Sequence, residues 1–325
     1  MVWFLLVLLA DQFETTFHAG LVALNQGNLA VAQSQLESAS RMHPRDSRVW
    51  LSLAQTYWKL HQPQPAQIAA RKAEEFADDP AVLRALAFYY SEAADPSRAA
   101  QLLQAVIQRR PYDEASYFDL AQLQLKQQNF AAALAAIDAG RKNFDKSAQL
   151  ELAAGVACYG LRRFPEAIDA FLRTIQLDPS AEQPYVFLGR VADQAEDKLP
   201  RITQVFADYS RRAPDNYLAT FLYGKSLLLG EDPAQSESLL RKSISQNNSF
   251  WESHFELGVL LDEQGKFEEA AREVRRAIEL NPNDPAPHYR LARLYDRLGR
   301  AAEAQSEREL HAKLAAAGSG MAGIK

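Results

Sequence analysis

Histidine, cysteine and carboxylate side chains carry much of the catalytic and metal-binding chemistry of proteins, and in this sequence they are dispersed. The six histidines are His18, His43, His61, His254, His288 and His311. No pair of them has the HExxH spacing that places two imidazoles on one helix face around a zinc ion. Cys158 is the only cysteine, so neither an intrachain disulfide nor a cysteine zinc cluster can form. These residue types predict no metal site.

Adjacent carboxylates, such as Asp78 with Asp79 and Glu268 with Glu269, can supply acid–base chemistry. Both pairs lie near predicted turns, where exposure to solvent is the simpler explanation. The sequence also has no glycine-rich phosphate loop, no GxSxG nucleophile motif and no indicated Cys–His pairing. We therefore expect a protein that is not an enzyme and needs no cofactor.

The charge balance argues against a nucleic-acid partner. Acidic residues number 41 and basic residues 36, which gives a formal net charge of −5, and both kinds are spread along the chain. Phosphate backbones are bound by clustered lysine and arginine, and no such cluster is present. The 47% of hydrophobic residues is ample for a packed core.

A short apolar segment, residues 1–12, begins with MVWFLLVLLA. It is shorter than the roughly 17 to 25 residues that cross a bilayer, so we expect no membrane span. The run resembles the apolar part of an export signal without the preceding basic residues. The interpretations are a truncated signal, an end-capping helix, or a true anchor behind a wrongly assigned start. An exported or periplasmic location is favoured, with a cytoplasmic one as the alternative.

The elements that position the side chains follow from small residues that recur from Phe13 onward. One series, at intervals of 33 to 35 residues, is Gly20, Ala54, Ala87, Ala121, Gly155, Gly189, Gly224, Gly258 and Ala292. A second series is Ala32, Ala66, Ala99, Ala133, Ala167, Ser236, Ala270 and Ala304, with a member missing between Ala167 and Ser236. Small residues let two helix backbones approach closely where they cross, so each interval is predicted to hold two packed helices.

Residues 251–284 show the repeat most clearly. Small and apolar residues fall at helical spacing in two successive segments, at Leu257, Gly258, Leu261, Ala270, Val274 and Ala277. Gly265 makes the turn between the two helices, and Pro282 stops the second one. Prolines at equivalent places are predicted to end other second helices, namely Pro44, Pro111, Pro179 and Pro214.

This pattern resembles the tetratricopeptide repeat, with His254, Leu261 and Val274 at the usual Trp, Tyr and Phe positions. The resemblance implies an all-α fold, a right-handed α-solenoid of about nine helix-turn-helix repeats over residues 13–317. The repeats span about 13–46, 47–79, 80–113, 114–147, 148–181, 182–216, 217–250, 251–284 and 285–317. A flexible tail is expected at 318–325. Cys158 is equivalent to Leu261, which predicts a buried thiol.

The sixth repeat, at about 182–216, departs from the pattern. It is one residue longer, has Leu199-Pro200 where the second helix should begin, and places Ile202 where its neighbours have Ala. Two interpretations stay open. One is a locally altered helix crossing, and the other is a change in superhelix curvature that shapes a binding groove.

The resemblance also implies that the first helices line a concave groove that binds a protein or peptide segment. Carried over by repeat position, the candidate binding residues are Trp58, Arg84, Phe88, Phe118, Gln122, Tyr159, Arg190, Phe221, Lys225, Phe255, Val259, Tyr289 and Arg293. Asp262 is a further candidate. The aromatic members suit an extended or helical apolar segment. The alternative is that these residues only pack against neighbouring first helices.

The predicted function is therefore a non-catalytic scaffold that assembles a multiprotein complex through this groove. The basic residues of the family's carboxylate clamp are not reproduced, so an acidic chaperone tail is not the expected ligand. The alternative function is a self-associating or cell-envelope structural component, which the apolar N-terminus motivates.

Overall fold

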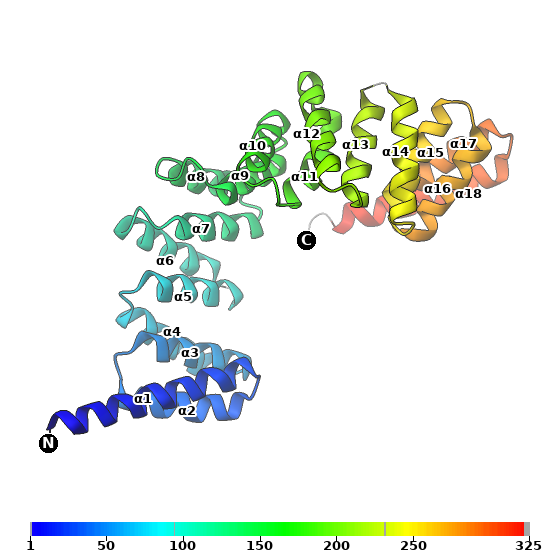
Figure 1. Ribbon diagram of the computed structural model, residues 1–325. Helices are drawn as coiled ribbons and strands as arrows, with labels where there is room; N and C mark the ends of the chain where they lie inside the picture. Colours follow the sequence, from blue (N-terminus) through cyan, green and yellow to red (C-terminus); the bar gives the residue numbers. More distant parts are fainter. Residues whose placement is uncertain (1, 94, 231, 322–325) are drawn as a thin grey trace. The chain divides into compact units, whose positions relative to one another are not determined.

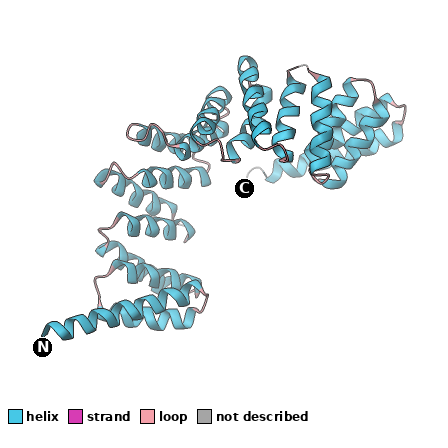
Figure 2. Ribbon diagram, in the orientation of Figure 1, coloured by secondary structure: helices cyan, strands magenta, loops and turns pink. Residues whose placement is uncertain are grey.

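The computed structural model describes the backbone of residues 2–93, 95–230 and 232–321, and the side chains of all of these except 2–11, 196 and 318–321. Within that part, the chain forms 18 α-helices, two short 3₁₀ helices and no strand (Figure 1; Figure 2). In chain order the α-helices make nine successive pairs. The predicted all-α fold of repeated helix pairs is confirmed.

The helices divide into two compact blocks, residues 1–163 and 164–325, which are described separately. The N-terminal block holds α1 (Val2–Asn25), α2 (Leu29–Met42), α3 (Ser47–Lys59), α4 (Pro63–Phe76), α5 (Pro80–Glu92), α6 (Pro96–Arg109), α7 (Glu114–Lys126), α8 (Phe130–Arg141) and α9 (Ala148–Gly160). The C-terminal block holds α10 (Phe164–Leu177), α11 (Gln183–Val191), η1 (Ala192–Gln194), η2 (Glu196–Lys198), α12 (Leu199–Arg212), α13 (Tyr217–Leu229), α14 (Pro233–Gln246), α15 (Trp251–Glu263), α16 (Phe267–Leu280), α17 (Pro285–Arg297) and α18 (Ala301–Met321).

Polar caps and prolines set the helix ends. Asp46, Asp79 and Asp284 each accept a hydrogen bond from the backbone N–H two residues further on, which satisfies a donor that a helix start leaves unpaired. At the other end, the second helices α2, α6, α10, α12 and α16 each stop two residues before a proline. The predicted role of these prolines is confirmed.

Among the described residues, the turn inside six of the nine repeats contains a left-handed residue. Gly27, Gly265 and Gly299 have φ of 76°, 76° and 72°. In other repeats the equivalent residue is not glycine, and His61, Gln128 and Arg162 adopt φ of 57°, 59° and 58°. Because this conformation is uncommon for residues with a Cβ, these three turns depend on the packing of the helices they join.

The small residues of the second helices lie at the centre of the core. All eight members of the second series, Ala32 through Ala304, are fully buried. In the first helices the approach is equally close, because a Cβ added at Gly258 would lie 2.5 Å from Cγ2 of Val274. Cys158 is buried in α9, as the sequence predicts.

The sixth repeat has an altered helix crossing. Its first helix, α11, ends at Val191 and is followed by the two 3₁₀ helices, and Ile202 of α12 is fully buried at the place of the missing small residue. An added Cβ on Gly189 would meet Leu222 of α13 at 2.3 Å, whereas in the seventh and eighth repeats Gly224 and Gly258 meet their own second helices. The first-helix glycine of the sixth repeat thus packs most closely against the next repeat.

The two ends of the chain are helical in the described part. Helix α1 runs from Val2 through the predicted apolar segment, and α18 continues past Gly318 to Met321. The remainder of the predicted tail, 322–325, lies outside the described residues, as does Met1. No helix that could be searched in the described chain combines the length and the apolar character that a bilayer crossing requires.

Candidate functional site

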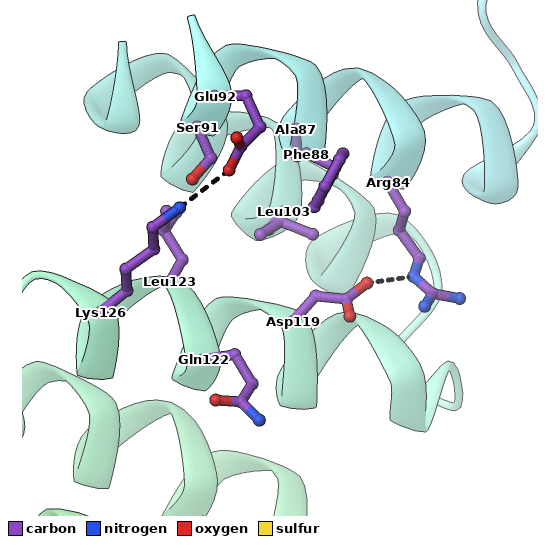
Figure 3. Close-up of a pocket in the computed structure, with 10 residues that line it drawn as sticks. All are labelled: Arg84, Ala87, Phe88, Ser91, Glu92, Leu103, Asp119, Gln122, Leu123 and Lys126. Carbon is purple, nitrogen blue, oxygen red and sulfur yellow. Dashed lines mark hydrogen bonds and ion pairs between the residues drawn. The ribbon is translucent and has the colours of Figure 1, made fainter. Parts of the chain in front are cut away.

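Three of the predicted binding residues line one pocket of the N-terminal block. Helix α5 packs against both α6 and α7, and a pocket of about 290 Å³ opens between them (Figure 3). Its lining residues are Arg84, Ala87, Phe88, Ser91, Glu92, Leu103, Asp119, Gln122, Leu123 and Lys126. The pocket thus brings together Arg84, Phe88 and Gln122 of the predicted set.

Helical spacing places these side chains on facing surfaces. The residues of α5 recur at three- and four-residue intervals from Arg84 to Ser91, and those of α7 do so from Asp119 to Lys126. Ala87, Leu103 and Leu123 are buried and form an apolar floor. Phe88 stands at the edge with 66% of its surface exposed.

Two ion pairs join α5 to α7 across the pocket. Nε of Arg84 donates a hydrogen bond to Oδ2 of Asp119 at 2.5 Å, and Nζ of Lys126 donates one to Oε1 of Glu92 at 2.8 Å. Figure 3 shows Phe88 and the apolar residues between these two pairs. The side chains of Arg84 and Asp119 are 32% and 34% exposed and those of Lys126 and Glu92 are 64% and 48% exposed, so water screens both pairs and each contributes only about 0–1 kcal/mol. Their effect on the pocket is to leave its rim formally neutral.

The other predicted residues of this block lie outside the pocket. Trp58 lines a separate cavity of about 240 Å³ with Tyr89 and Tyr90, and its ring meets that of Tyr89 edge to face, with 6.3 Å between centroids. Phe118 is half-buried on α7 and Tyr159 is exposed on α9. The first helices α3, α5, α7 and α9 contact one another in sequence, but the cavity at Trp58 is lined by residues of α4 and α5 and by none of α7.

In the C-terminal block the predicted residues fall into two groups. Phe221 is buried, with only 6% of its surface exposed, and it packs edge to face on Phe250 at 5.0 Å. Phe255 and Val259 are half-buried. The sequence expected these side chains to face a partner, and for Phe221 the neighbouring ring has taken that place.

The other predicted residues of this block are charged or exposed, and each lies against a neighbouring side chain. Nζ of Lys225 pairs with Oε1 of Glu256 at 3.2 Å. The guanidinium of Arg190 lies 5.7 Å from the ring of Phe187, and that of Arg293 lies 6.0 Å from the exposed ring of Tyr289. Burial raises the pKa of Glu252 on α15, although the positive charges of Lys225 and Arg190 oppose that rise.

Asp262 serves the fold and is not open to a partner. Its side chain is 2% exposed, and Oδ2 accepts a hydrogen bond from Arg290 at 3.0 Å while Oδ1 accepts one from Arg297. Both arginines belong to α17, so the carboxylate ties α15 to the next first helix. The expectation that Asp262 contacts a partner is wrong, because two cations already occupy its oxygens.

Two buried histidines also have structural roles that the sequence analysis missed. Nδ1 of His254 lies 2.7 Å from Glu273, and one repeat later Nδ1 of His288 lies 2.6 Å from Glu307. The signal was present as the same histidine–glutamate separation in two consecutive repeats. The ion pairs between α5 and α7 also had a signal in the sequence, because the paired residues carry opposite charges and lie about one repeat apart. Across the described residues, no three His, Cys, Asp or Glu side chains converge as a metal site would require.

Two family models, both described as tetratricopeptide repeat, match this chain. One matches residues 17–80 and 118–182, and the other matches residues 261–307. Together they cover more than half of the sequence and include repeats from both blocks. A search of curated proteins finds no match.

Solved structures share the architecture at low sequence identity. The C-terminal part of a TPR repeat-containing protein from Cytophaga hutchinsonii aligns over 85% of this chain and 99% of its own, with 15% identity and a TM-score of 0.54. Yeast Tom70 aligns over 91% of this chain and 83% of its own, with 15% identity and a TM-score of 0.49. MamA from Desulfovibrio magneticus RS-1 aligns over 53% and 97%, with 18% identity and a TM-score of 0.45.

Proposed function

The chain belongs to the tetratricopeptide repeat family, and we propose that it is a non-catalytic scaffold that binds a protein or peptide segment on its first helices and so assembles a multiprotein complex. Repeats of this family generally mediate protein–protein interaction, and the fold is typically non-catalytic.

The observation that carries the proposal is the exposed Phe88 beside an apolar pocket. Large aromatic side chains that stand in solvent next to an apolar hollow are typical of contact surfaces, since their burial by a partner removes much apolar area from water. Buried aromatic anchors also dominate the binding energy of protein interfaces.

The charged groups of the pocket suit binding better than catalysis. Arg84 is engaged by Asp119 and Lys126 by Glu92, and none of the four lies in the pocket with a cysteine or histidine that it could activate. In this arrangement the ion pairs hold α5 and α7 in register and leave the apolar surface between them open to a partner.

Affinity capture combined with crosslinking mass spectrometry tests the proposal. The purified chain should retain specific partners, with crosslinks that map to α5 and α7, and Phe88→Ala should lose them. Tyr112→Ala is the matched control, because Tyr112 is an aromatic residue with 80% of its surface exposed that lies in the α6–α7 loop outside this pocket.

The possible results distinguish an error in the proposed binding surface from an error in the proposed function. Partners that bind Phe88→Ala as well as the unaltered chain would show that another surface is used. Absence of any specific partner for the folded, unaltered chain would overturn the scaffold function itself. Circular dichroism confirms that each variant is folded before its capture is compared.

A further inference from the structure

We propose that the α5–α6–α7 pocket takes one large apolar side chain, aromatic or aliphatic, from an uncharged stretch of the partner segment. The inference rests on the proposed function and names the ligand chemistry of its site. Three observations carry it: the size of the pocket, the character of Phe88 within the repeat series, and the neutral rim.

The volume fits one large side chain. The pocket measures about 290 Å³. Sites for drug-sized ligands range from about 300 to 1,000 Å³, so this pocket lies at the bottom of that range. A cavity of about 150 Å³ already holds benzene, which is the ring of a phenylalanine side chain. One large side chain and a part of the backbone that carries it therefore suit the space.

Phe88 is exceptional among the residues at its repeat position, all of which are described. The other members are Leu21, Gln55, Gln122, Val156, Arg190, Lys225, Val259 and Arg293. The exposed ones among them are polar, and the apolar ones are half-buried. Phe88 alone is both apolar and exposed. Phe88 also stands beside an apolar pocket, and the combination of an exposed ring with an apolar hollow favours a contact role.

The rim selects against charge. Arg84 with Asp119 at one end and Glu92 with Lys126 at the other leave no formal charge in excess (Figure 3). A carboxylate or ammonium group brought to the apolar floor would lose hydration without gaining a free counter-ion, which is costly. An uncharged apolar side chain loses no such hydration, and it buries Phe88, Leu103 and Leu123 on entry.

Selection of short random peptides displayed on phage against the purified full chain tests this inference. The selected peptides should share one large apolar residue flanked by uncharged positions. Their dissociation constants, measured by fluorescence anisotropy, should rise at least tenfold for Phe88→Ala, which removes the anchor surface. Gln122→Trp, which fills the pocket from an exposed rim position, should have a similar effect. Tyr112→Ala should bind as the unaltered chain does.

A charge variant tests whether the rim selects the ligand. A purely structural role of the ion pair would not change which peptides are selected. Asp119→Asn leaves Arg84 without its anionic partner, so selection on this variant should enrich peptides with an acidic residue beside the apolar anchor. Asp138→Asn is the matched control, because Asp138 pairs with Arg141 at 3.0 Å on α8, away from the pocket. That control should select the same peptides as the unaltered chain.

Four results would overturn the inference. Peptides whose shared residue is charged would contradict the neutral rim. Apolar peptides that bind Phe88→Ala and Gln122→Trp with unchanged affinity would place binding elsewhere and leave the scaffold function standing. Failure to select any peptide, together with failure of the partner capture above, would overturn both proposals. Light scattering of the chain alone identifies a second copy as the occupant, which would also contradict a heterologous segment.

Discussion

Phe88 in the N-terminal block and Phe221 in the C-terminal block are both predicted to face a partner, yet 66% of Phe88 is exposed and only 6% of Phe221 is. The charged residues differ in the same way. Asp119, which pairs with Arg84, is 34% exposed, whereas Asp262, which pairs with two arginines, is 2% exposed. The first helices of the C-terminal block have thus turned several candidate contact residues into packing, while those around α5 and α7 keep a pocket open.

Repeat position alone therefore does not assign a role to a side chain. Its exposure depends on the neighbouring first helix and on the segment before that helix. Phe250, just ahead of α15, covers Phe221, and α17 supplies both arginines to Asp262. No ring stands in the corresponding place over Phe88 among the described ring contacts. The following experiments compare matched residues of the N-terminal and C-terminal blocks.

The greatest loss of stability is expected when the buried phenylalanine of the two is removed. Phe221→Ala should lower the free energy of unfolding by about 3–5 kcal/mol, because it removes a buried ring from the core. Phe88→Ala should change it by less than about 0.5 kcal/mol, because the ring is mostly in solvent. Urea denaturation followed by circular dichroism measures both. Equal losses of stability in the two variants would remove the contrast.

The ion pairs provide the next largest effect. Replacing both Arg290 and Arg297 with Met leaves the buried Asp262 carboxylate without a cation and should cost about 3 kcal/mol. Arg84→Met leaves Asp119 without a partner at a position that water reaches, and should cost about 0–1 kcal/mol. The same denaturation experiment compares them. If adding Asp262→Ala to the double variant restored none of the lost stability, the unpaired charge would not be the cause.

The small residues at the helix crossings should behave alike in both blocks. Ala133→Leu on α8 and Ala167→Leu on α10 each overpack a fully buried site and should cost about 1–3 kcal/mol. Ala133→Gly and Ala167→Gly control for the loss of the native residue without added bulk. A large effect in one block and none in the other would show that the contrast extends into the core.

The smallest effect concerns one tyrosine in each block, the half-buried Tyr57 and the buried Tyr209. Burial, assisted by Glu37, raises the pKa of Tyr57 to about 12, and burial, assisted by Glu182, raises the pKa of Tyr209 to about 12. Since the ordinary tyrosine value is about 10, the stability that each neutral phenol provides is complete below about pH 10 and is lost as pH rises toward 12.

Phenolate absorbance measures this titration. In each of the variants Tyr57→Phe and Tyr209→Phe, the number of tyrosines that titrate above pH 11 should fall by one. Glu37→Gln and Glu182→Gln should lower the late-titrating pKa of the neighbouring tyrosine without removing the titration. Unchanged late titration in all four variants would mean that these two residues are not its source.

The sequence predicted the repeat and much of its local structure. Small residues at 33- to 35-residue intervals fixed the helix pairs, and prolines and polar caps fixed their ends. The sequence also marked the sixth repeat as irregular through Ile202, which proved fully buried. These features depend on contacts within one repeat, and their residues lie close together in the chain.

The candidate site was only partly predicted. Arg84, Phe88 and Gln122 were named, but Leu103, Glu92, Asp119 and Lys126 were not. Leu103 comes from a second helix and the three charged residues pair across repeats, whereas the position rule that was used lists first-helix residues one repeat at a time. The same limitation hid the burial of Phe221 and Asp262.

Periodic small and apolar residues specify packing that is local to each repeat. The sequence was therefore sufficient to assign the family, the helix pairs and the surface on which to look for binding. Only the tertiary structure decided which of the candidate side chains remain available. Exposure and pairing depend on residues that meet from neighbouring repeats, such as Phe250 over Phe221 and Asp119 against Arg84, and a side chain already satisfied by a neighbour has little left to offer a partner.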